Sequence, residues 1–400
     1  MRLVFVDETF SFEFLRTLGH APYGAADIGE CLATASRIAD GDVEIWHREW
    51  YRTAERVRHD AEASEAGGHP VSARGAYLRA SNYYRAAEFF LHERPDDPRI
   101  LATWRASRNA FARAVSLLPH PAEAVEIPYE GTTLSGYFYR PVDDVPPRPT
   151  LVFHGGLDST LEELYPAGAV AALAHGYNCL TFAGPGQGRT IREQGLPFRP
   201  DWECVVTPVV DYALTRPEVD SARIALLGWS LGGYLAPRAA ACEHRLAALI
   251  AWDGAFDNFA AAQPMLPPDA RADADELFAR NPRSFDAHFE EVMRARTGAR
   301  WAFTHGMCAF GVTSPGELIA AGRAYHLRGL AERITCPTLV CEAEDDPFWQ
   351  GQPRQLYEAL TCRKTFLRFT TDEGAGEHCH VGAHILFHQR AFDWLDDVLR

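Results

Sequence analysis

The segment Arg223-Ile-Ala-Leu-Leu-Gly-Trp-Ser230-Leu-Gly-Gly-Tyr-Leu-Ala-Pro-Arg-Ala-Ala-Ala241 joins an apolar strand pattern to an alanine-rich helix pattern through Gly228-x-Ser230-x-Gly232. A nucleophilic serine on a sharp strand-to-helix turn requires this arrangement. Glycines on both sides let the strand and the helix approach closely. The start of the helix lies beneath the serine, where its positive partial charge favours a developing oxyanion. The segment therefore predicts Ser230 as a nucleophile.

On both sides of this segment, apolar strand patterns alternate with helical patterns. Alternation of this kind predicts an α/β fold with a mostly parallel sheet covered by helices on both faces. Two strands expected at Glu126–Tyr129 and Leu134–Arg140 form an antiparallel pair that precedes the alternating region, so the sheet is expected to have eight strands. The expected strands are Glu126–Tyr129, Leu134–Arg140, Thr150–His154, Asn178–Phe182, Arg223–Gly228, Leu246–Trp252, Thr338–Glu342 and Lys364–Phe369, and helices are expected at Leu161–His175, Trp202–Thr215 and His384–Leu399.

Two regions depart from the alternation. Residues 1–121 show helical periodicity and no strand pattern, so we predict an all-helical N-terminal domain there and an α/β domain over residues 122–400. The aromatic residues of the N-terminal region fit helix packing, with a substrate-facing or dimer-facing surface as the alternative. Between Trp252 and Pro337 the signals are again helical, which predicts a helical insertion at about 257–332 that would cover the site as a lid.

The composition restricts the classes of partner. A net charge of −15 disfavours nucleic acids and anionic membrane surfaces, which attract basic patches. No apolar run is long enough to cross a bilayer, and no signal-peptide stretch follows Met1. Nine cysteines without a Cys-x-x-Cys pair fit a reducing compartment. We expect a cytoplasmic protein that acts on a small molecule, with no nucleic-acid or membrane partner.

A serine nucleophile needs a base, and the base needs a carboxylate that orients it. The strand over 338–342 ends in two acids, of which Asp346 is favoured over Asp345 as the triad acid. A glycine-bearing loop after the last strand carries two histidines, with His378 expected to be the base and His380 the alternative.

The oxyanion of a tetrahedral intermediate needs two backbone donors. The Leu231 amide follows the nucleophile directly and is expected to be one of them. The other is expected in the loop after the strand that ends at His154, where Gly156 is preferred and Leu157 is the alternative.

Two further patterns resemble ligand sites. The run Gly184-Pro-Gly-Gln-Gly188 lacks the Gly-Lys-Ser/Thr of a phosphate loop, and a loop at the pocket rim is the preferred interpretation. The histidines 378, 380, 384 and 388 are spaced like metal ligands, but no His-Glu-x-x-His accompanies them, and His384 and His388 would face solvent from a helix. We therefore expect no metal and no other cofactor.

These motifs together resemble one branch of the α/β-hydrolase superfamily, which includes 2,6-dihydroxypseudooxynicotine hydrolase and the fungal yellowish-green-type polyketide-shortening hydrolases. The resemblance rests on residues 155–163, 184–188, 228–236 and 374–379 and extends into the helical front half through residues 77–90. It implies an α/β-hydrolase fold with an N-terminal helical cap, and commonly a homodimer. It also implies the nucleophile, acid and base roles of Ser230, Asp346 and His378.

The resemblance further implies hydrolysis of a carbon–carbon bond beside a ketone (a retro-Claisen cleavage), or of an acyl bond, in a bulky polyketide-like or aromatic substrate. A leaving carbanion must be protonated, and the nearest unassigned acids are Asp253 and Asp257, whose plainer interpretation is a strand-end turn. The alternatives are an ester or thioester hydrolase or acyltransferase, and a non-catalytic binding or regulatory protein on the same scaffold.

Overall fold

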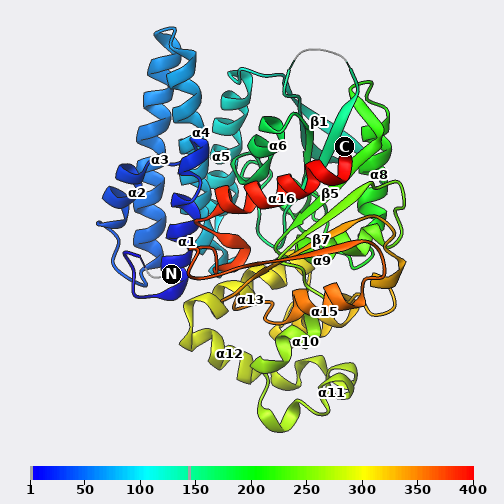
Figure 1. Cartoon of the computed structure of the whole chain (residues 1–400). Helices are drawn as coiled ribbons and strands as arrows, with labels where there is room; N and C mark the ends of the chain where they lie inside the picture. The colour runs from blue at the N-terminus through cyan, green and yellow to red at the C-terminus, as the bar shows by residue number, and fades with distance from the viewer. Residues whose placement is uncertain (1–2, 143–145) are drawn as a thin grey trace.

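The computed structural model describes residues 3–142 and 146–400. Helices precede an eight-stranded sheet in the chain, and in Figure 1 they stand together at one side of it. These N-terminal helices are α1 (Glu8–Leu18), α2 (Ile28–Ala35), α3 (Val43–Ala66), α4 (Pro70–Glu88) and α5 (Pro98–Ser116).

The start of α5 shows how the sequence sets a helix boundary. The Asp97 carboxylate accepts a hydrogen bond from the Arg99 amide, and Pro98 occupies the first turn, where a missing N–H costs nothing. The face that carries Trp104 and Phe111 is buried. The helix therefore begins where Asp97-Pro98 indicates and packs through its apolar side.

The sheet has the strand order β1-β2-β4-β3-β5-β6-β7-β8. β2 runs antiparallel to β1 and to β4, and the strands from β4 to β8 in this order are parallel to one another. This confirms the predicted mostly parallel, eight-stranded sheet. The strands are β1 (Ala122–Tyr129), β2 (Thr132–Tyr139), β3 (Arg148–His154), β4 (Asn178–Phe182), β5 (Val219–Trp229), β6 (Ala248–Trp252), β7 (Thr338–Ala343) and β8 (Lys364–Phe369).

Alternate residues of the strands enter different cores, as the two-residue period of a strand requires. In β3, Leu151 and Phe153 pack with the N-terminal helices and with α16 (His384–Leu399), whereas Val152 packs with α8 (Glu203–Leu214) and α9 (Gly232–Ala240). Both faces of the sheet are thus covered, and α16 crosses one of them in Figure 1. The remaining short helices of this half are α6 (Val170–Ala174), α7 (Gly188–Arg192) and α15 (Gln352–Ala359).

The helix expected over 161–175 differs from the prediction. The chain forms buried turns up to Glu163, then a π-helix over Tyr165–Ala169, and only then α6. The Glu163 carboxylate pairs with Arg16 of α1, so this part of the chain is shaped by a contact with the N-terminal helices.

The interval between β6 and β7 is helical, as predicted, and has a small core of its own. Phe259, Phe278, Phe289, Phe303 and Ile319 pack together there. In Figure 1 these helices extend below the sheet. They are α10 (Asn258–Ala262), α11 (Ala274–Arg280), α12 (Asp286–Ala295), α13 (Thr297–Phe310) and α14 (Pro315–Ala321).

No helix among the described residues combines the length and the apolar character that crossing a bilayer requires.

Candidate active site

Ser230 lies on the turn between β5 and α9. Its φ of 64° is in the left-handed region, which a non-glycine residue adopts only when its surroundings hold it there. A Cβ on Gly228 would lie 2.0 Å from the Gly232 carbonyl oxygen, so only glycine lets the strand and the helix meet here. The turn presents the half-buried Ser230 hydroxyl beyond the end of the strand.

The three predicted residues Ser230, His378 and Asp346, which are far apart in the chain, form one chain of hydrogen bonds. Oγ of Ser230 lies 2.8 Å from Nε2 of His378, and Nδ1 of His378 lies 2.7 Å from Oδ2 of Asp346. His378 follows β8 and Asp346 follows β7, so both lie at the carboxyl end of the sheet. The amides of Phe348 and Trp349 donate to Oδ1 of Asp346 and hold its carboxylate in place.

The charges of the site influence one another. Burial alone would lower the pKa of His378, but the charge of Asp346, together with the hydrogen bonds to Asp346 and Asp253, holds that pKa well above its usual value. Burial would raise the pKa of Asp346, but the charge of His378 and the hydrogen bond between the two side chains hold it below the usual value. The arrangement favours an ionised Asp346 beside an imidazole that accepts protons readily.

The two sequence alternatives lie apart from this hydrogen-bond chain. Asp345 is exposed, and its carboxylate accepts a hydrogen bond from the hydroxyl of Thr371. His380 is fully buried, with Nδ1 3.2 Å from the carbonyl oxygen of Ala375 and its ring stacked on Phe369.

The expected oxyanion donors lie next to each other. A Cβ on Gly156 would lie 2.6 Å from the amide nitrogen of Leu231 and 2.9 Å from Cβ of Ser230. The Gly156 amide itself donates to Oγ of Ser159 at 3.3 Å. Within residues 3–142 and 146–400, the amides of Leu231 and Leu157 make no hydrogen bond, so these two N–H groups remain available to a ligand.

Gln187 holds this loop in place, a role that the sequence did not reveal. Its Nε2 donates to the carbonyl oxygens of Gly155 and Gly156 at 2.9 and 2.8 Å, and its Oε1 accepts from the Gly184 amide. Because C=O and N–H point in opposite directions in a trans peptide, fixing the Gly156 carbonyl also fixes the Leu157 N–H. The whole run over 184–188 is buried, and Gln187 connects it to the loop beside Ser230.

His305 of α13 holds the next peptide of the loop. Its Nε2 lies 3.2 Å from the carbonyl oxygen of Leu157, and its ring packs against His92 from the helical N-terminal region. Burial lowers the pKa of His305 to about 3. The insertion therefore contacts the loop over 155–157, called the oxyanion loop below, through the neutral imidazole of His305. The N-terminal region contacts that imidazole through His92.

Asp253 lies at the site, but not where a leaving group could reach it. The side chain is fully buried, Oδ2 lies 3.2 Å from Nδ1 of His378, and the Cys379 amide donates to the same oxygen. Its carboxyl group is behind the imidazole, on the side away from Ser230. The expectation that it protonates a leaving group is therefore not supported by its position.

Asp257 lies at the start of a helix, away from the triad. Its carboxylate accepts from the Ala260 amide at the start of α10 and pairs with Arg328. Among the described residues it makes no contact with Ser230, His378 or Asp346. This agrees with the plainer interpretation of Asp257 as a turn residue.

Possible metal ligands lie close together at the site itself. Asp253, His378 and Cys379 have ligand atoms within 4.8 Å of one another. The same atoms are engaged in the hydrogen bonds described above, with Sγ of Cys379 3.3 Å from Nε2 of His378. The expectation that His384 and His388 face solvent was wrong, because both are buried and His388 bonds to Tyr23 and Ala167.

A buried ion cluster joins the N-terminal helices to the site. The Arg16 guanidinium donates to both oxygens of Glu163 at 2.8 and 2.7 Å and to Asp158 at 2.5 Å, and it lies 5.6 Å from the ring centre of Trp229. Asp158 follows the oxyanion loop and Trp229 precedes Ser230. Arg16 therefore contacts both chain segments that build the site.

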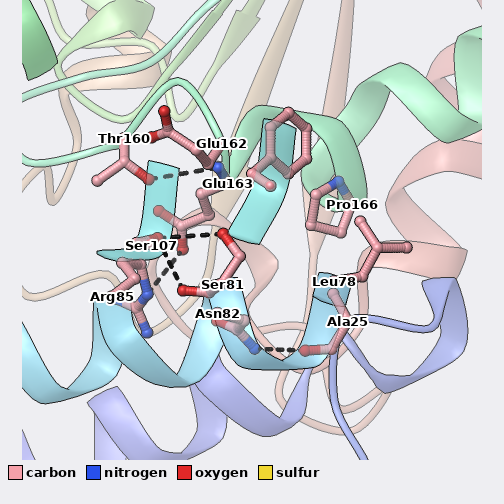
Figure 2. A pocket seen from close by; sticks show the side chains of 11 residues that line it. Ala25, Leu78, Ser81, Asn82, Arg85, Ser107, Thr160, Glu162, Glu163 and Pro166 are labelled. Carbon is pink, nitrogen blue, oxygen red and sulfur yellow. Dashed lines mark hydrogen bonds and ion pairs between the residues drawn. The ribbon is translucent and has the colours of Figure 1, made fainter. Parts of the chain in front are cut away.

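A small cavity lies beside this cluster, between α4, α5 and the turn after β3. Figure 2 shows Arg85 next to Glu163 at its wall. Its volume of ≈ 10 Å³ has room for about one water molecule. The cavity is a gap between packed elements and is too small for an organic substrate.

The chain is similar to known hydrolases over most of its length. A model of the alpha/beta hydrolase family matches residues 151–397, and a model described as esterase FrsA-like matches residues 38–259. Hydrolase acrC of Aspergillus aculeatus is 40% identical over 97% of this chain and 96% of the relative. A 20-hydroxy-prefusarin hydrolase of Gibberella moniliformis is 39% identical over 100% of this chain and 98% of the relative.

Among solved structures, the 2,6-dihydroxy-pseudo-oxynicotine hydrolase superposes with a TM-score of 0.76 at 24% identity, covering 95% of each chain. This likeness shows that the fold is shared from the N-terminal helices to the last helix. The matched family model and the full-length relatives establish that the chain belongs to the alpha/beta hydrolase family and is a hydrolase.

Proposed function

We propose that this hydrolase is a serine hydrolase in which Ser230 is the nucleophile, His378 the general base and Asp346 the acid that orients the base. The observation that carries the proposal is the continuous chain of hydrogen bonds from Oγ of Ser230 through the imidazole to Oδ2 of Asp346, at 2.8 and 2.7 Å. These distances are within the range needed for proton transfer.

In the proposed reaction His378 takes the proton of Ser230 as Oγ attacks the carbonyl carbon of the substrate. The amides of Leu231 and Leu157 stabilise the oxyanion in this proposal. Neither N–H has a hydrogen-bond partner among the described residues, and Gly156, next to Leu157 in the chain, lies against the Leu231 amide. Gly156, the donor preferred from the sequence, serves in this proposal as the residue small enough to leave that space open.

The tetrahedral intermediate then collapses. The bond to the leaving group breaks, its electron pair passes to the leaving atom, and the imidazolium of His378 supplies the proton. Water hydrolyses the acyl-serine by the same steps. No separate acid is needed, so the reaction does not depend on Asp253 or Asp257 as a proton donor.

For the bond that is cleaved, we propose a carbon–carbon bond beside a ketone, or an acyl bond, in a bulky polyketide-like or aromatic small molecule. The sequence resemblance supports this class, and one relative is named a 20-hydroxy-prefusarin hydrolase. The match to an esterase FrsA-like model favours ester or thioester hydrolysis as the second candidate.

Product analysis separates the two candidates. The purified protein and its Ser230→Ala variant are incubated with a series of aryl 1,3-diketones and, in parallel, with p-nitrophenyl esters of increasing bulk. We expect a ketone and a carboxylic acid from a diketone, formed only by the protein with Ser230. Turnover of esters alone would contradict carbon–carbon cleavage, and turnover of neither would favour a binding protein.

The proposal includes an arrangement of the chain around the site. Residues 1–121 act as a cap and residues 257–332 as a lid, supported by the contacts of Arg16 and His305 with the oxyanion loop. We also propose a cytoplasmic homodimer. All nine cysteines are described and unpaired, which supports a reducing compartment, and sedimentation velocity tests the dimer.

A further inference from the structure

Nδ1 of His378 faces two carboxyl groups. Oδ2 of Asp346 lies at 2.7 Å and Oδ2 of Asp253 at 3.2 Å. A neutral imidazole has one N–H at this position, and a single carboxylate is enough to orient it. The second acid is therefore unexplained by the proposed mechanism.

The fold holds Asp253 in this position firmly. It follows β6, which lies between β5 and β7 in the sheet, so its side chain emerges between the strands that lead to Ser230 and Asp346. Its φ of 58° is in the left-handed region, which a non-glycine residue adopts only where its surroundings hold it. The Cys379 amide binds its Oδ2, next in the chain to His378.

The surroundings of Asp253 disfavour its charged form. Burial raises the pKa of Asp253 to about 6, and the negative charge of Asp346 contributes in the same direction. Oδ1 of Asp253 has no hydrogen-bond partner among the described residues. The titratable groups that face it are His378, Cys379 and His380 from the segment after β8, Asp346, and Cys341 of β7.

We propose that Asp253 is a second positioning acid for His378, which orients the imidazole through Nδ1 whenever Asp346 does not. The proposal rests on the proposed function, because it assigns Asp253 to the same base. When Asp346 loses its charge, its repulsion of the Asp253 carboxylate disappears. Oδ2 of Asp253 already lies 3.2 Å from Nδ1 of His378, so it can accept the hydrogen bond of the Nδ1–H in place of Asp346.

The test uses Asp346→Asn, Asp253→Asn and the double variant, with the rate of phosphonylation by a fluorophosphonate and the hydrolysis of p-nitrophenyl acetate as readouts. Loss of the only orienting acid costs a serine triad about 10⁴-fold. We expect a loss of about 10²-fold in Asp346→Asn, a few-fold in Asp253→Asn, and about 10⁴-fold in the double variant. A double variant no slower than Asp346→Asn would overturn the proposal.

Asp257→Asn is the matched control, since Asp257 is also a buried acid after β6 but lies away from His378. In the Asp346→Asn background it should change the rate no further. Ser230→Ala separates the two proposals. Activity in that variant would overturn the serine mechanism and this role together. An inactive Ser230→Ala, combined with a double variant that is no slower than Asp346→Asn, would overturn the role of Asp253 alone.

A spectroscopic readout serves if Asp253→Asn does not fold. Proton NMR of Asp346→Asn should still show a low-field Nδ1–H resonance of His378, because Asp253 would bind that proton. Its absence, with the resonance present in the unmodified protein, would overturn the proposal.

Discussion

His378 can act as a base only in its neutral form, and its environment determines where that form appears. Burial opposes the charged ring, but the interactions with Asp346 and Asp253 together raise the pKa of His378 well above the ordinary value of 6.5. The neutral fraction grows as the pH rises. We therefore predict that kcat/KM falls on acidification with a midpoint above pH 6.5, measured with p-nitrophenyl acetate over a pH range where tryptophan fluorescence shows an intact fold. A midpoint below pH 6 would contradict the account.

Gln187 is predicted to act on the rate through the oxyanion loop. In Gln187→Glu the amide that donates to Gly155 and Gly156 is replaced by a group that accepts, so both carbonyls lose their donor. Loss of an oxyanion donor costs about 10²–10³-fold in kcat, and we expect a loss on the order of 10²-fold with little change in KM.

Gln194→Glu is the control for this variant, because Gln194 donates to the carbonyl of Thr133, outside the site. It should keep the full rate. A Gln187→Glu enzyme that loses substrate affinity while its kcat is unchanged would show that Gln187 does not position the oxyanion donor.

At the scale of elements, the turn after β3 and the turn after β5 meet at Gly156. A methyl group there would lie 2.6 Å from the Leu231 amide nitrogen, in the space proposed for the oxyanion. We predict that Gly156→Ala lowers kcat by about 10²-fold or more. The variant should still unfold cooperatively in urea, which would show that the loss of activity is not a loss of fold. Gly75→Ala in α4, where a Cβ meets only the end of Arg79 at 3.7 Å, should keep full activity. An active Gly156→Ala would place the oxyanion elsewhere.

The elements that the sequence predicted well are those with a local cause. The Gly-x-Ser-x-Gly turn and the strands Asn178–Phe182 and Lys364–Phe369 were expected with these residues. The position of Asp346 after its strand also favoured it over its neighbour Asp345. Each of these depends on residues close together in the sequence.

The features that escaped prediction depend on contacts between distant segments. Gln187 and His305 reach the oxyanion loop from different elements, and no local pattern shows which carbonyl a side chain will bind. Asp253 was noticed as an acid after a strand, but its place behind the imidazole follows from how β6 lies between its neighbours. The burial of His384 and His388 likewise follows from the packing of α16 on the sheet.

For the whole molecule, the boundary near residue 121 is a change of topology within a shared core. Phe10, Trp46 and Tyr83 from the N-terminal helices belong to the same buried cluster as Trp229 and Trp252 of the sheet. The sequence predicted a helical half and an α/β half but contained no sign of this common core. The ion cluster around Arg16 also joins the two halves, because Arg16 precedes this boundary in the chain and its partners Asp158 and Glu163 follow it.

Removal of Arg16 is predicted to weaken both halves. Arg16→Met leaves Glu163 and Asp158 without their main cation in a buried setting, and breaking a buried pair costs about 3–5 kcal/mol. We expect a loss of that order in the free energy of urea unfolding, together with slower turnover, because Arg16 also contacts Trp229.

The control is Arg280→Met, which removes a pair with Glu276 whose side chains are 78% and 63% exposed. Surface pairs contribute about 0–1 kcal/mol, so this variant should unfold almost as the unmodified protein does. Equal losses in the two variants would contradict a special role for the buried cluster.

The central claim is that Ser230 is the nucleophile, activated by His378. Its most direct test is mass-spectrometric mapping of the adduct formed with a fluorophosphonate on the unmodified protein, Ser230→Ala and His378→Ala. The account predicts one adduct on the peptide that contains Ser230, no adduct in Ser230→Ala, and much slower labelling in His378→Ala. An adduct on another residue, or unchanged labelling of Ser230→Ala, would contradict it.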